Sequence, residues 1–150
     1  LKLDYSGFHP DVQVMIDAAD RDSCYCWALN NRPRLNFWST PRVSLLGDSA
    51  HPTLPYMAQG AVMAIEDAAV LTRALDEFGS IADALKAYEM ARIDRTARIV
   101  DESTEHARLY HHEKHGDFRR EFAKKNPDSD RSRWLYNYDP LQIKLEHSVI

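Results

Sequence analysis

Residue types that could bind a ligand are concentrated in the segment LLGDSAHPTLPYMAQGAVMAIEDAAVL, residues 45–71. Asp48 follows Gly47 and a short apolar run that predicts a strand. Its carboxylate is therefore expected at the carboxyl end of a sheet, where open α/β folds bind their ligands. Because a carboxylate accepts hydrogen bonds from hydroxyl groups, the segment predicts a site for a sugar-like polyol at Asp48.

The loop after Asp48 leads into a predicted helix whose first main-chain N–H groups have no partner within the helix. Pro52 and Pro55 stiffen the loop, and Gln59 and Gly60 open the helix. Such a helix end attracts negative charge, and Gly60 lets a planar ligand approach the backbone without meeting a Cβ. A polyol at Asp48 and an anionic ring at Gly60 together describe the ribityl chain and the pyrimidine edge of a reduced flavin.

A histidine-rich run is the strongest metal candidate, and it consists of His106, His111, His112 and His115. A helix would place His111 and His115 on one face, where they could supply two metal ligands. The run does not match HExxH and offers no third ligand at a defined distance. We therefore expect a solvated helix face and no metal.

Three arginines at three-residue spacing, Arg92, Arg95 and Arg98, could bind a phosphate. Acidic residues close to them on the same predicted helix favour helical ion pairs instead. We therefore expect a charged outer face or a domain contact. A hydrolase is not favoured either, because GDSAH lacks the Gly-x-Ser-x-Gly pattern of a nucleophile elbow.

The expected fold class is α/β, mostly helical with a few strands. Alternating residues predict strands at the start of the chain and over residues 24–29, where Cys24 and Cys26 would share one face as core thiols. The run VSLL, residues 43–46, predicts a strand buried on both faces of a layered sheet. The polar stretch NNRPRLN, residues 30–36, is the best candidate for a linker.

Four helices are expected, the last a short one in the charged segment DFRREFAKKNPDSDRSR before an Asn-Pro-Asp turn, and the first three have periodicity or end signals. Pro10 suits the first turn of a short helix, and a second helix follows Gln59. Ser80, with Asp83 three residues later, predicts the N-cap of a long third helix that runs to Gly116. The apolar stripe of the second helix is expected to consist of Ala61, Ala64, Ala68, Leu71 and Leu75.

Composition restricts the classes of function. The chain of 150 residues is 44% hydrophobic and 28% charged, and its net charge of −4 lacks the basic excess that nucleic-acid binding needs. No apolar run approaches the roughly 18 residues of a membrane span, and no signal-peptide pattern opens the chain. We expect a cytoplasmic protein that binds neither nucleic acid nor a membrane.

Both ends of the chain support expectations about its context. The chain begins at Leu1 rather than Met, with strand-like alternation already under way, which predicts the C-terminal part of a longer protein. The tail, with Trp134, Tyr136 and Tyr138, could pack on a neighbouring copy in a homodimer or fold back on its own core. The second arrangement is the one expected.

The segment GDSAHPTLPYMAQGAVMAIEDAAVL closely resembles the second flavin motif of the class A FAD-dependent aromatic hydroxylases, the para-hydroxybenzoate hydroxylase superfamily. The salicylate and 6-hydroxynicotinate hydroxylase branch is the most similar, and FHPDVQVMIDAAD, YEMARIDRTARIV and RWLYNYDP resemble it in the same order. The resemblance implies the C-terminal part of a Rossmann-like, FAD- and NAD(P)-binding monooxygenase. It divides the chain into the end of a substrate-binding domain (1–35), part of an FAD-binding domain with the GD motif (36–78), and C-terminal helices and tail (79–150).

The resemblance also implies an activity and its residues. NAD(P)H would reduce FAD, and O2 would supply the oxygen that hydroxylates a small phenolic or hydroxypyridine-type aromatic acid. His51 or Tyr56 would help to deprotonate or orient the substrate, although His51 could instead only brace the loop. The implied cofactor contacts are Gly47 and Asp48 at the ribityl hydroxyls, Gln59, Gly60, Ala61 and Val62 at the pyrimidine edge, and Pro52, Pro55 and Tyr56 between flavin and substrate.

The sequence departs from the family pattern in two places. Asn31, directly before Arg32, stands where many relatives have an acidic residue. The chain also has no Gly-x-Gly-x-x-Gly, the fingerprint that holds the FAD pyrophosphate in relatives, so this part alone is expected to be inactive. The alternative is a truncated, non-catalytic helical module that contacts partners through its long third helix and its tail.

Overall fold

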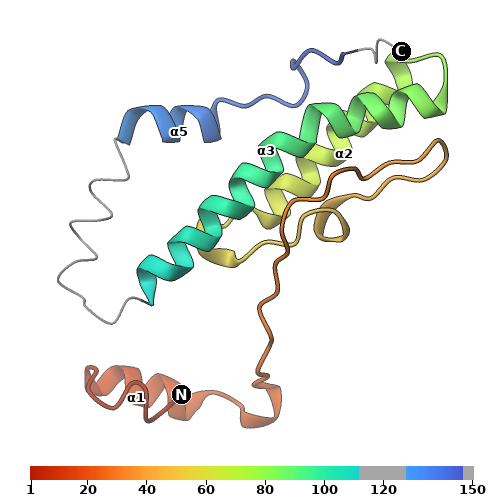
Figure 1. The fold of residues 1–150 in the computed structure, drawn as a ribbon. Helices are drawn as coiled ribbons and strands as arrows, with labels where there is room; N and C mark the ends of the chain where they lie inside the picture. Colours follow the sequence, from red (N-terminus) through yellow and green to blue (C-terminus); the bar gives the residue numbers. More distant parts are fainter. Residues whose placement is uncertain (112–127, 147–150) are drawn as a thin grey trace.

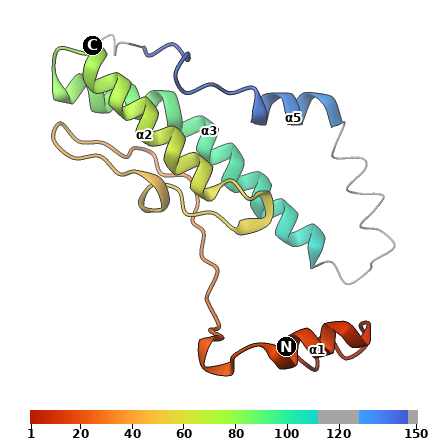
Figure 2. The same ribbon diagram turned by 180° about the vertical axis from the view of Figure 1, so that it is seen from behind.

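An antiparallel pair of helices forms the centre of the computed structural model, which describes residues 1–111 and 128–146 (Figure 1). Helix α2, Gly60–Glu77, turns at residues 78–80 into helix α3, Ile81–Tyr110. The loop of residues 36–58 lies along one side of this pair. The C-terminal segment, with helix α5 (Asp128–Tyr136), lies along the opposite side, and Figure 2 shows the same arrangement from behind.

The N-terminal segment lies apart from the helix pair (Figures 1 and 2). It contains α1, Pro10–Ala18, and the short 3-10 helix η1, Arg21–Ser23. The expected helix start is confirmed, because Pro10 occupies the first turn and His9 is the N-cap. No residue of α1 is buried, so this helix contributes no core contact within the described residues.

The expected strands are absent from residues 1–111 and 128–146, so the α/β expectation is confirmed only in its helical part. A single antiparallel bridge, Ser39–Ser44, is all the pairing these ranges contain. Val43 is 63% exposed, so VSLL is not buried on both faces. Residues 24–29 form neither a helix nor a strand, and both cysteines are exposed rather than core thiols. A strand requires a neighbouring strand for its backbone hydrogen bonds, and the described ranges supply almost none.

Helix α2 buries a different face from the one expected. Ala61, Ala68 and Leu75 of the predicted stripe are exposed. The prediction counted only apolar positions, whereas the face turned toward α3 also carries two acidic residues. The buried residues of α2 are Met63, Glu66, Asp67, Val70 and Ala74.

Helix α3 begins as its cap signal predicts. The Ser80 hydroxyl accepts a hydrogen bond from the Asp83 N–H at 3.1 Å and donates to the Asp83 carboxylate at 2.7 Å. The helix ends at Tyr110, and residues 112–116 of the expected extension lie outside the described residues. No helix in the described ranges is both long and apolar enough to cross a membrane.

Two residues of α3 fix the loop of residues 36–58 against the helix pair. The Glu89 carboxylate accepts hydrogen bonds from the N–H groups of Trp38 and Ser39, both at 2.6 Å. The Tyr88 hydroxyl donates to the Leu45 carbonyl at 3.1 Å. The buried Trp38 ring packs edge-on against Tyr88, with ring centroids 5.7 Å apart. The loop is therefore anchored to the core before it reaches Gly47.

The C-terminal tail folds back on the chain's own helices, as expected. Leu135 is buried in a cluster with Met63, Ile99 and Val100. The Arg73 guanidinium of α2 donates to main-chain carbonyls of the tail at 2.9 and 3.0 Å. The tail thus completes the core on the face of the helix pair opposite the loop.

Candidate functional site

The turn that carries Asp48 is a short 3-10 helix, η2, Gly47–Ser49, and not the end of a paired strand. Gly47 is buried with φ +60°, a conformation that favours glycine. A Cβ added there would lie 3.3 Å from the Ala64 Cβ of α2. The Ser49 hydroxyl accepts from the Leu46 N–H at 3.1 Å and donates to the Leu46 carbonyl at 2.7 Å. These contacts close the turn and leave the Asp48 side chain exposed.

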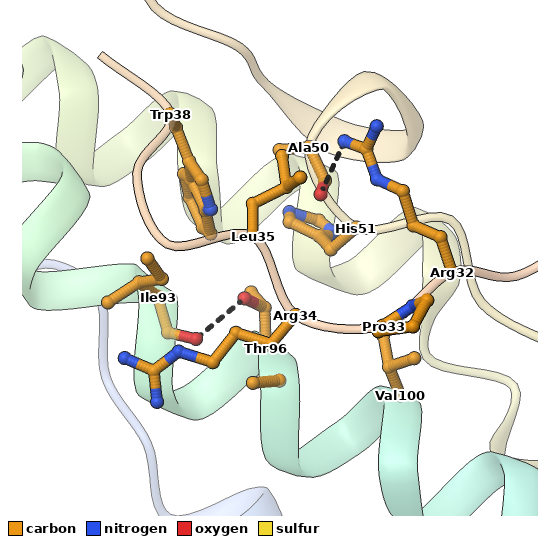
Figure 3. Close-up of a pocket in the computed structure, with 11 residues that line it drawn as sticks. Arg32, Pro33, Arg34, Leu35, Trp38, Ala50, His51, Ile93, Thr96 and Val100 are labelled. Carbon is orange, nitrogen blue, oxygen red and sulfur yellow. Dashed lines mark hydrogen bonds between the residues drawn. The ribbon is translucent and has the colours of Figure 1, made fainter.

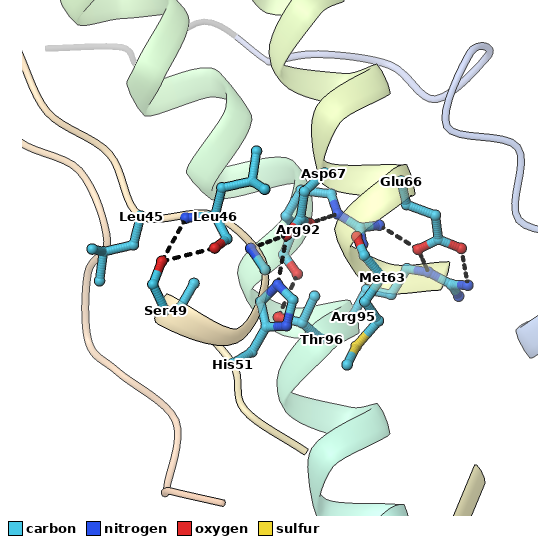
Figure 4. A network of polar contacts seen from close by, with 12 residues as sticks. Leu45, Leu46, Ser49, His51, Met63, Glu66, Asp67, Arg92, Arg95 and Thr96 are labelled. Carbon is cyan, nitrogen blue, oxygen red and sulfur yellow. Dashed lines mark hydrogen bonds and ion pairs between the residues drawn. The ribbon is translucent and has the colours of Figure 1, made fainter. Parts of the chain in front are cut away.

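A buried carboxylate of α2 lies directly against this turn (Figure 4). One oxygen of Asp67, Oδ2, accepts from the Gly47 N–H at 3.0 Å and lies 2.6 Å from His51 Nε2. The other, Oδ1, accepts from Arg92 Nε at 2.7 Å. Asp67 itself is 0% exposed. A single side chain therefore joins α2, α3 and the turn.

The electrostatics of Asp67 determine which atoms donate. Burial by itself raises the pKa of Asp67, but the hydrogen bond from His51 and the charge of Arg92 outweigh it and hold that pKa below its usual value. An ionised carboxylate only accepts hydrogen bonds, so His51 Nε2 carries the proton between the two groups.

Two further charged residues extend this contact into a buried network. Arg92 Nη1 lies 2.8 Å from Glu66 Oε2, and the Arg95 guanidinium donates to both oxygens of Glu66 at 2.9 and 2.8 Å. The two carboxylates and two guanidinium groups balance in charge. The expected outer face is thus wrong for Arg92 and Arg95, which are buried. It holds for the exposed Arg98, which pairs with Glu102 one helical turn later at 2.8 Å.

The linker residue Arg32 holds the same turn from the other side. Its guanidinium donates to the Ala50 carbonyl at 2.8 Å and to the Ser49 carbonyl, and Figure 3 shows it beside Ala50. Arg32 and His51 both line a small pocket between the loop and α3. Asn31, where relatives were expected to carry an acid, donates to the Thr104 hydroxyl of α3 at 2.7 Å. The linker is thereby fixed to both the turn and α3.

The start of α2 provides the second half of the candidate site. Gln59 is its buried N-cap residue, and no side chain caps the helix. The first main-chain N–H groups, of Gly60, Ala61 and Val62, therefore receive no side-chain cap, as expected. A Cβ at Gly60 would meet Thr53 Cγ2 at 3.4 Å, which is ordinary contact. Packing within this chain does not require glycine at that position.

Tyr56 lies in the short 3-10 helix η3, Pro55–Met57, between these two halves. Its hydroxyl lies 2.7 Å from His111 Nε2, and its ring stacks on Tyr110 with centroids 5.7 Å apart. Pro55 is exposed. Of the histidine-rich run, His112 and His115 fall outside the described residues. Within the described ranges, no group of three or more His, Cys, Asp or Glu side chains could hold a metal ion.

Sequence reasoning did not assign Arg32 and Asp67 to the turn that they hold, nor Glu66 to the network behind it. It considered Arg92 and Arg95 only as phosphate ligands or as charges on an outer face or a domain contact. A signal for them was present. Two adjacent acids interrupt the apolar pattern of α2, and two arginines recur three residues apart in the next helix. Opposite charges at such positions on neighbouring helices indicate a buried ionic contact when both helices are otherwise apolar there.

Comparisons with known proteins show the family of the chain. Residues 13–103 match the family model described as FAD binding domain. The chain is 38% identical over 141 residues to a 6-hydroxynicotinate 3-monooxygenase of Bordetella bronchiseptica, covering 93% of this chain and 32% of that protein. It is 44% identical over 108 residues to a 3-hydroxybenzoate 6-hydroxylase of Klebsiella oxytoca, covering 71% of this chain and 27% of that protein.

A solved structure shares the fold as well. The crystal structure of Klebsiella pneumoniae HpxO, complexed with FAD and uric acid, matches with a TM-score of 0.74 and 29% identity. The match covers 83% of this chain and 32% of that one. This chain thus spans about a third of the length of the relatives it matches. It belongs to the FAD binding domain family, among the class A FAD-dependent aromatic hydroxylases.

Proposed function

We propose that this chain forms the C-terminal part of an FAD-dependent monooxygenase that hydroxylates a small aromatic acid, using NAD(P)H and O2. Relatives named as hydroxylases of hydroxylated aromatic acids support the reaction class. The single observation that carries the proposal is the preformed Gly47–Ser49 turn. It presents an exposed Asp48 on the same loop that leads to an uncapped helix start.

The residues of this chain fit a flavin. Asp48 is exposed, so its oxygens are available to the ribityl hydroxyls. Main-chain N–H groups at Gly60, Ala61 and Val62 suit the electron-rich pyrimidine edge. Gly60 is not demanded by internal packing, which is consistent with a close approach by a ligand. Bound FAD supplies hydride acceptance and oxygen activation, and the protein supplies placement and exclusion of water.

The two residues expected near the substrate receive different roles. His51 is only 5% exposed, and its Nε2 is engaged by Asp67. We therefore assign it to bracing the loop, the alternative that the sequence left open. Tyr56 is half-buried, and its hydroxyl is paired with His111. A Tyr–His pair can orient or deprotonate a phenolic substrate, so Tyr56 remains the candidate for that role.

The alternative function is a non-catalytic module that binds partners, and part of the surface expected to bind them is buried inside this chain. It relied on the long helix, now α3, and on the tail as contacts for partners. Arg92 and Arg95 of α3 are instead buried in internal ion pairs, and the Trp134 and Tyr138 rings lie against Arg95 with its Cζ 5.1 and 3.8 Å from their centroids. Flavin binding separates the two functions.

The experiment is a comparison of Asp48→Ala with Asp76→Ala in the complete protein. Asp76 is an exposed aspartate of α2, distant from the turn in sequence, so its variant controls for the loss of one surface charge. Removal of one carboxylate that accepts hydroxyls should raise the Kd for FAD roughly tenfold or more, as for a charge-assisted hydrogen bond. Fluorescence titration of the FAD-free protein measures this Kd. An unchanged Kd for Asp48→Ala, equal to that of Asp76→Ala, contradicts the assignment.

A further inference from the structure

Side chains from outside the turn at Asp48 bind its main chain both before and after Asp48. Asp67 accepts the N–H of Gly47, the residue immediately before Asp48. Arg32 donates to the carbonyls of Ser49 and Ala50, the two residues that follow Asp48. The residue between these contacts is the one whose side chain remains exposed.

A single oxygen of Asp67 also contacts both ends of the segment of residues 47–51. Its Oδ2 contacts the Gly47 N–H at 3.0 Å and His51 Nε2 at 2.6 Å. The main-chain N–H of His51 in turn donates to the Gly47 carbonyl at 2.9 Å, so the main chain of residues 47–51 closes on itself. Movement of the Asp67 carboxylate would therefore tilt the Leu46–Gly47 peptide plane and shift His51 at the far end of the segment together.

The position of Asp67 is fixed independently of the turn. Its other oxygen accepts from Arg92 Nε, and Arg92 is ion-paired with Glu66, which the Arg95 guanidinium also binds. Arg92 further donates to the Met63 carbonyl at 3.2 Å. The helix pair thus holds the carboxylate in place before any ligand binds. This is the arrangement expected of residues that orient a binding group from behind.

We propose that Asp67 and Arg32 are positioning residues for the flavin site, which hold residues 47–51 in one conformation and thereby orient Asp48. The inference rests on the proposed function for its ligand. It assigns to this chain two residues that do not touch the cofactor and yet set the affinity for it.

The first test compares Asp67→Asn with Glu66→Gln in the complete protein. An asparagine offers one acceptor oxygen where three donors now converge, so the turn or Arg92 must lose its partner. Glu66→Gln removes the same charge from the same network but leaves every contact to the turn in place. Asp67→Asn should raise the Kd for FAD roughly 10–100-fold, as when partners of metal ligands are lost. Glu66→Gln should raise it by less than about threefold.

A second readout does not depend on bound FAD. Hydrogen–deuterium exchange of the peptide covering residues 45–51 in the FAD-free protein should be faster in Asp67→Asn than in wild type, and unchanged in Glu66→Gln. If Asp67→Asn fails to fold, Arg32→Ala tests the turn from the linker, where the Arg32 side chain is half-buried. It should also accelerate exchange of this peptide and weaken FAD binding.

The outcomes separate this inference from the function on which it rests. Equal increases in Kd for Asp67→Asn and Glu66→Gln, or unchanged exchange at residues 45–51 in both Asp67→Asn and Arg32→Ala, would overturn the positioning role. An unchanged Kd for FAD in both Asp67→Asn and Arg32→Ala, with a raised Kd in Asp48→Ala, would also overturn the positioning role but would leave the flavin site in place. An unchanged Kd in Asp48→Ala would instead remove the flavin assignment itself.

Discussion

Replacement of Arg92 by methionine should destabilise the protein strongly, and more so near neutral pH than in mild acid. Arg92 is 0% exposed and lies 2.7 Å from Asp67 and 2.8 Å from Glu66. Methionine retains much of the aliphatic length but leaves two buried carboxylates without this partner. Removal of one member of a buried ion pair costs about 3–5 kcal/mol, and we expect a loss in that range.

The pH dependence follows from the position of the Asp67 pKa. In the wild type that pKa is held below its usual 3.8, so Asp67 contributes stability above this pH, and the contribution is lost as the pH falls through the folded-state pKa. Without Arg92, burial is opposed only by the hydrogen bonds from His51 and the Gly47 N–H, and the folded-state pKa rises. The variant then gains stability relative to wild type as the pH falls, because protonation removes the unpaired charge. Its deficit should be larger at about pH 7 than at about pH 5.

Urea unfolding of the complete protein, followed by circular dichroism at both pH values, measures this deficit. Arg98→Met is the matched control, since Arg98 is an exposed arginine of the same helix whose contacts are an ion pair with Glu102 and the face of the Trp134 ring. Its loss should cost about 1–2 kcal/mol, for the ion pair and the ring contact together, and the cost should be the same at either pH. A deficit for Arg92→Met as small as that of Arg98→Met, or one that grows as the pH falls, would refute this reasoning.

Three further sets of variants test the turn, the cap and the tail. Gly47→Ala should destabilise the protein by about 1–2 kcal/mol, because alanine is strained at the positive φ of Gly47. In the double variant, Ala64→Gly should restore only the part of this loss that is due to the 3.3 Å Cβ contact. Thermal unfolding of the single and double variants measures both parts, and full restoration would contradict the φ argument. Ser80→Ala should cost about 1 kcal/mol because the Asp83 N–H loses its acceptor, whereas Ser80→Gly should cost only a few tenths; equal losses in urea unfolding would count against the cap. Leu135→Ala should cost about 2–5 kcal/mol, since Leu135 is buried against α2 and α3, and an unchanged melting temperature would show that the tail does not complete the core.

Local signals in the sequence predicted the parts of the fold that depend on nearby residues. Pro10 marked the start of α1, and Ser80 with Asp83 marked the start of α3. The uncapped start of α2 followed from Gln59 and Gly60. Each of these features is decided by contacts within four residues, so a single sequence contains the necessary information.

The strand predictions were wrong because strand formation depends on residues far away in sequence. VSLL has the composition of a buried strand, but a strand forms only where another strand supplies hydrogen bonds, and its partner is set by chain far away in sequence. Within residues 1–111 and 128–146, Ser44 finds such a partner only in Ser39. Val43 is accordingly exposed rather than buried on both faces.

The residues that hold the site could not be assigned because their burial depends on the register between two helices. Apolar periodicity treats Glu66 and Asp67 as solvent-facing, and helical spacing alone pairs Arg92 and Arg95 with acids on their own helix. Which side of α3 faces α2 is decided by the packing of both helices. The motif around Asp48 was recognisable in the sequence. The adjacent acids and the spaced arginines gave only a signal that ionic contacts exist, whereas the partners in the network are decided by packing in three dimensions.

The most direct test of the account is a crystal structure of the complete protein with bound FAD. We predict a carboxylate oxygen of Asp48 within hydrogen-bonding distance of a ribityl hydroxyl, and the main-chain N–H groups at residues 60–62 facing the pyrimidine edge. We also predict that Gly47 retains its hydrogen bond to Asp67. A flavin bound away from this turn, with Asp48 directed into solvent, would contradict the central claim.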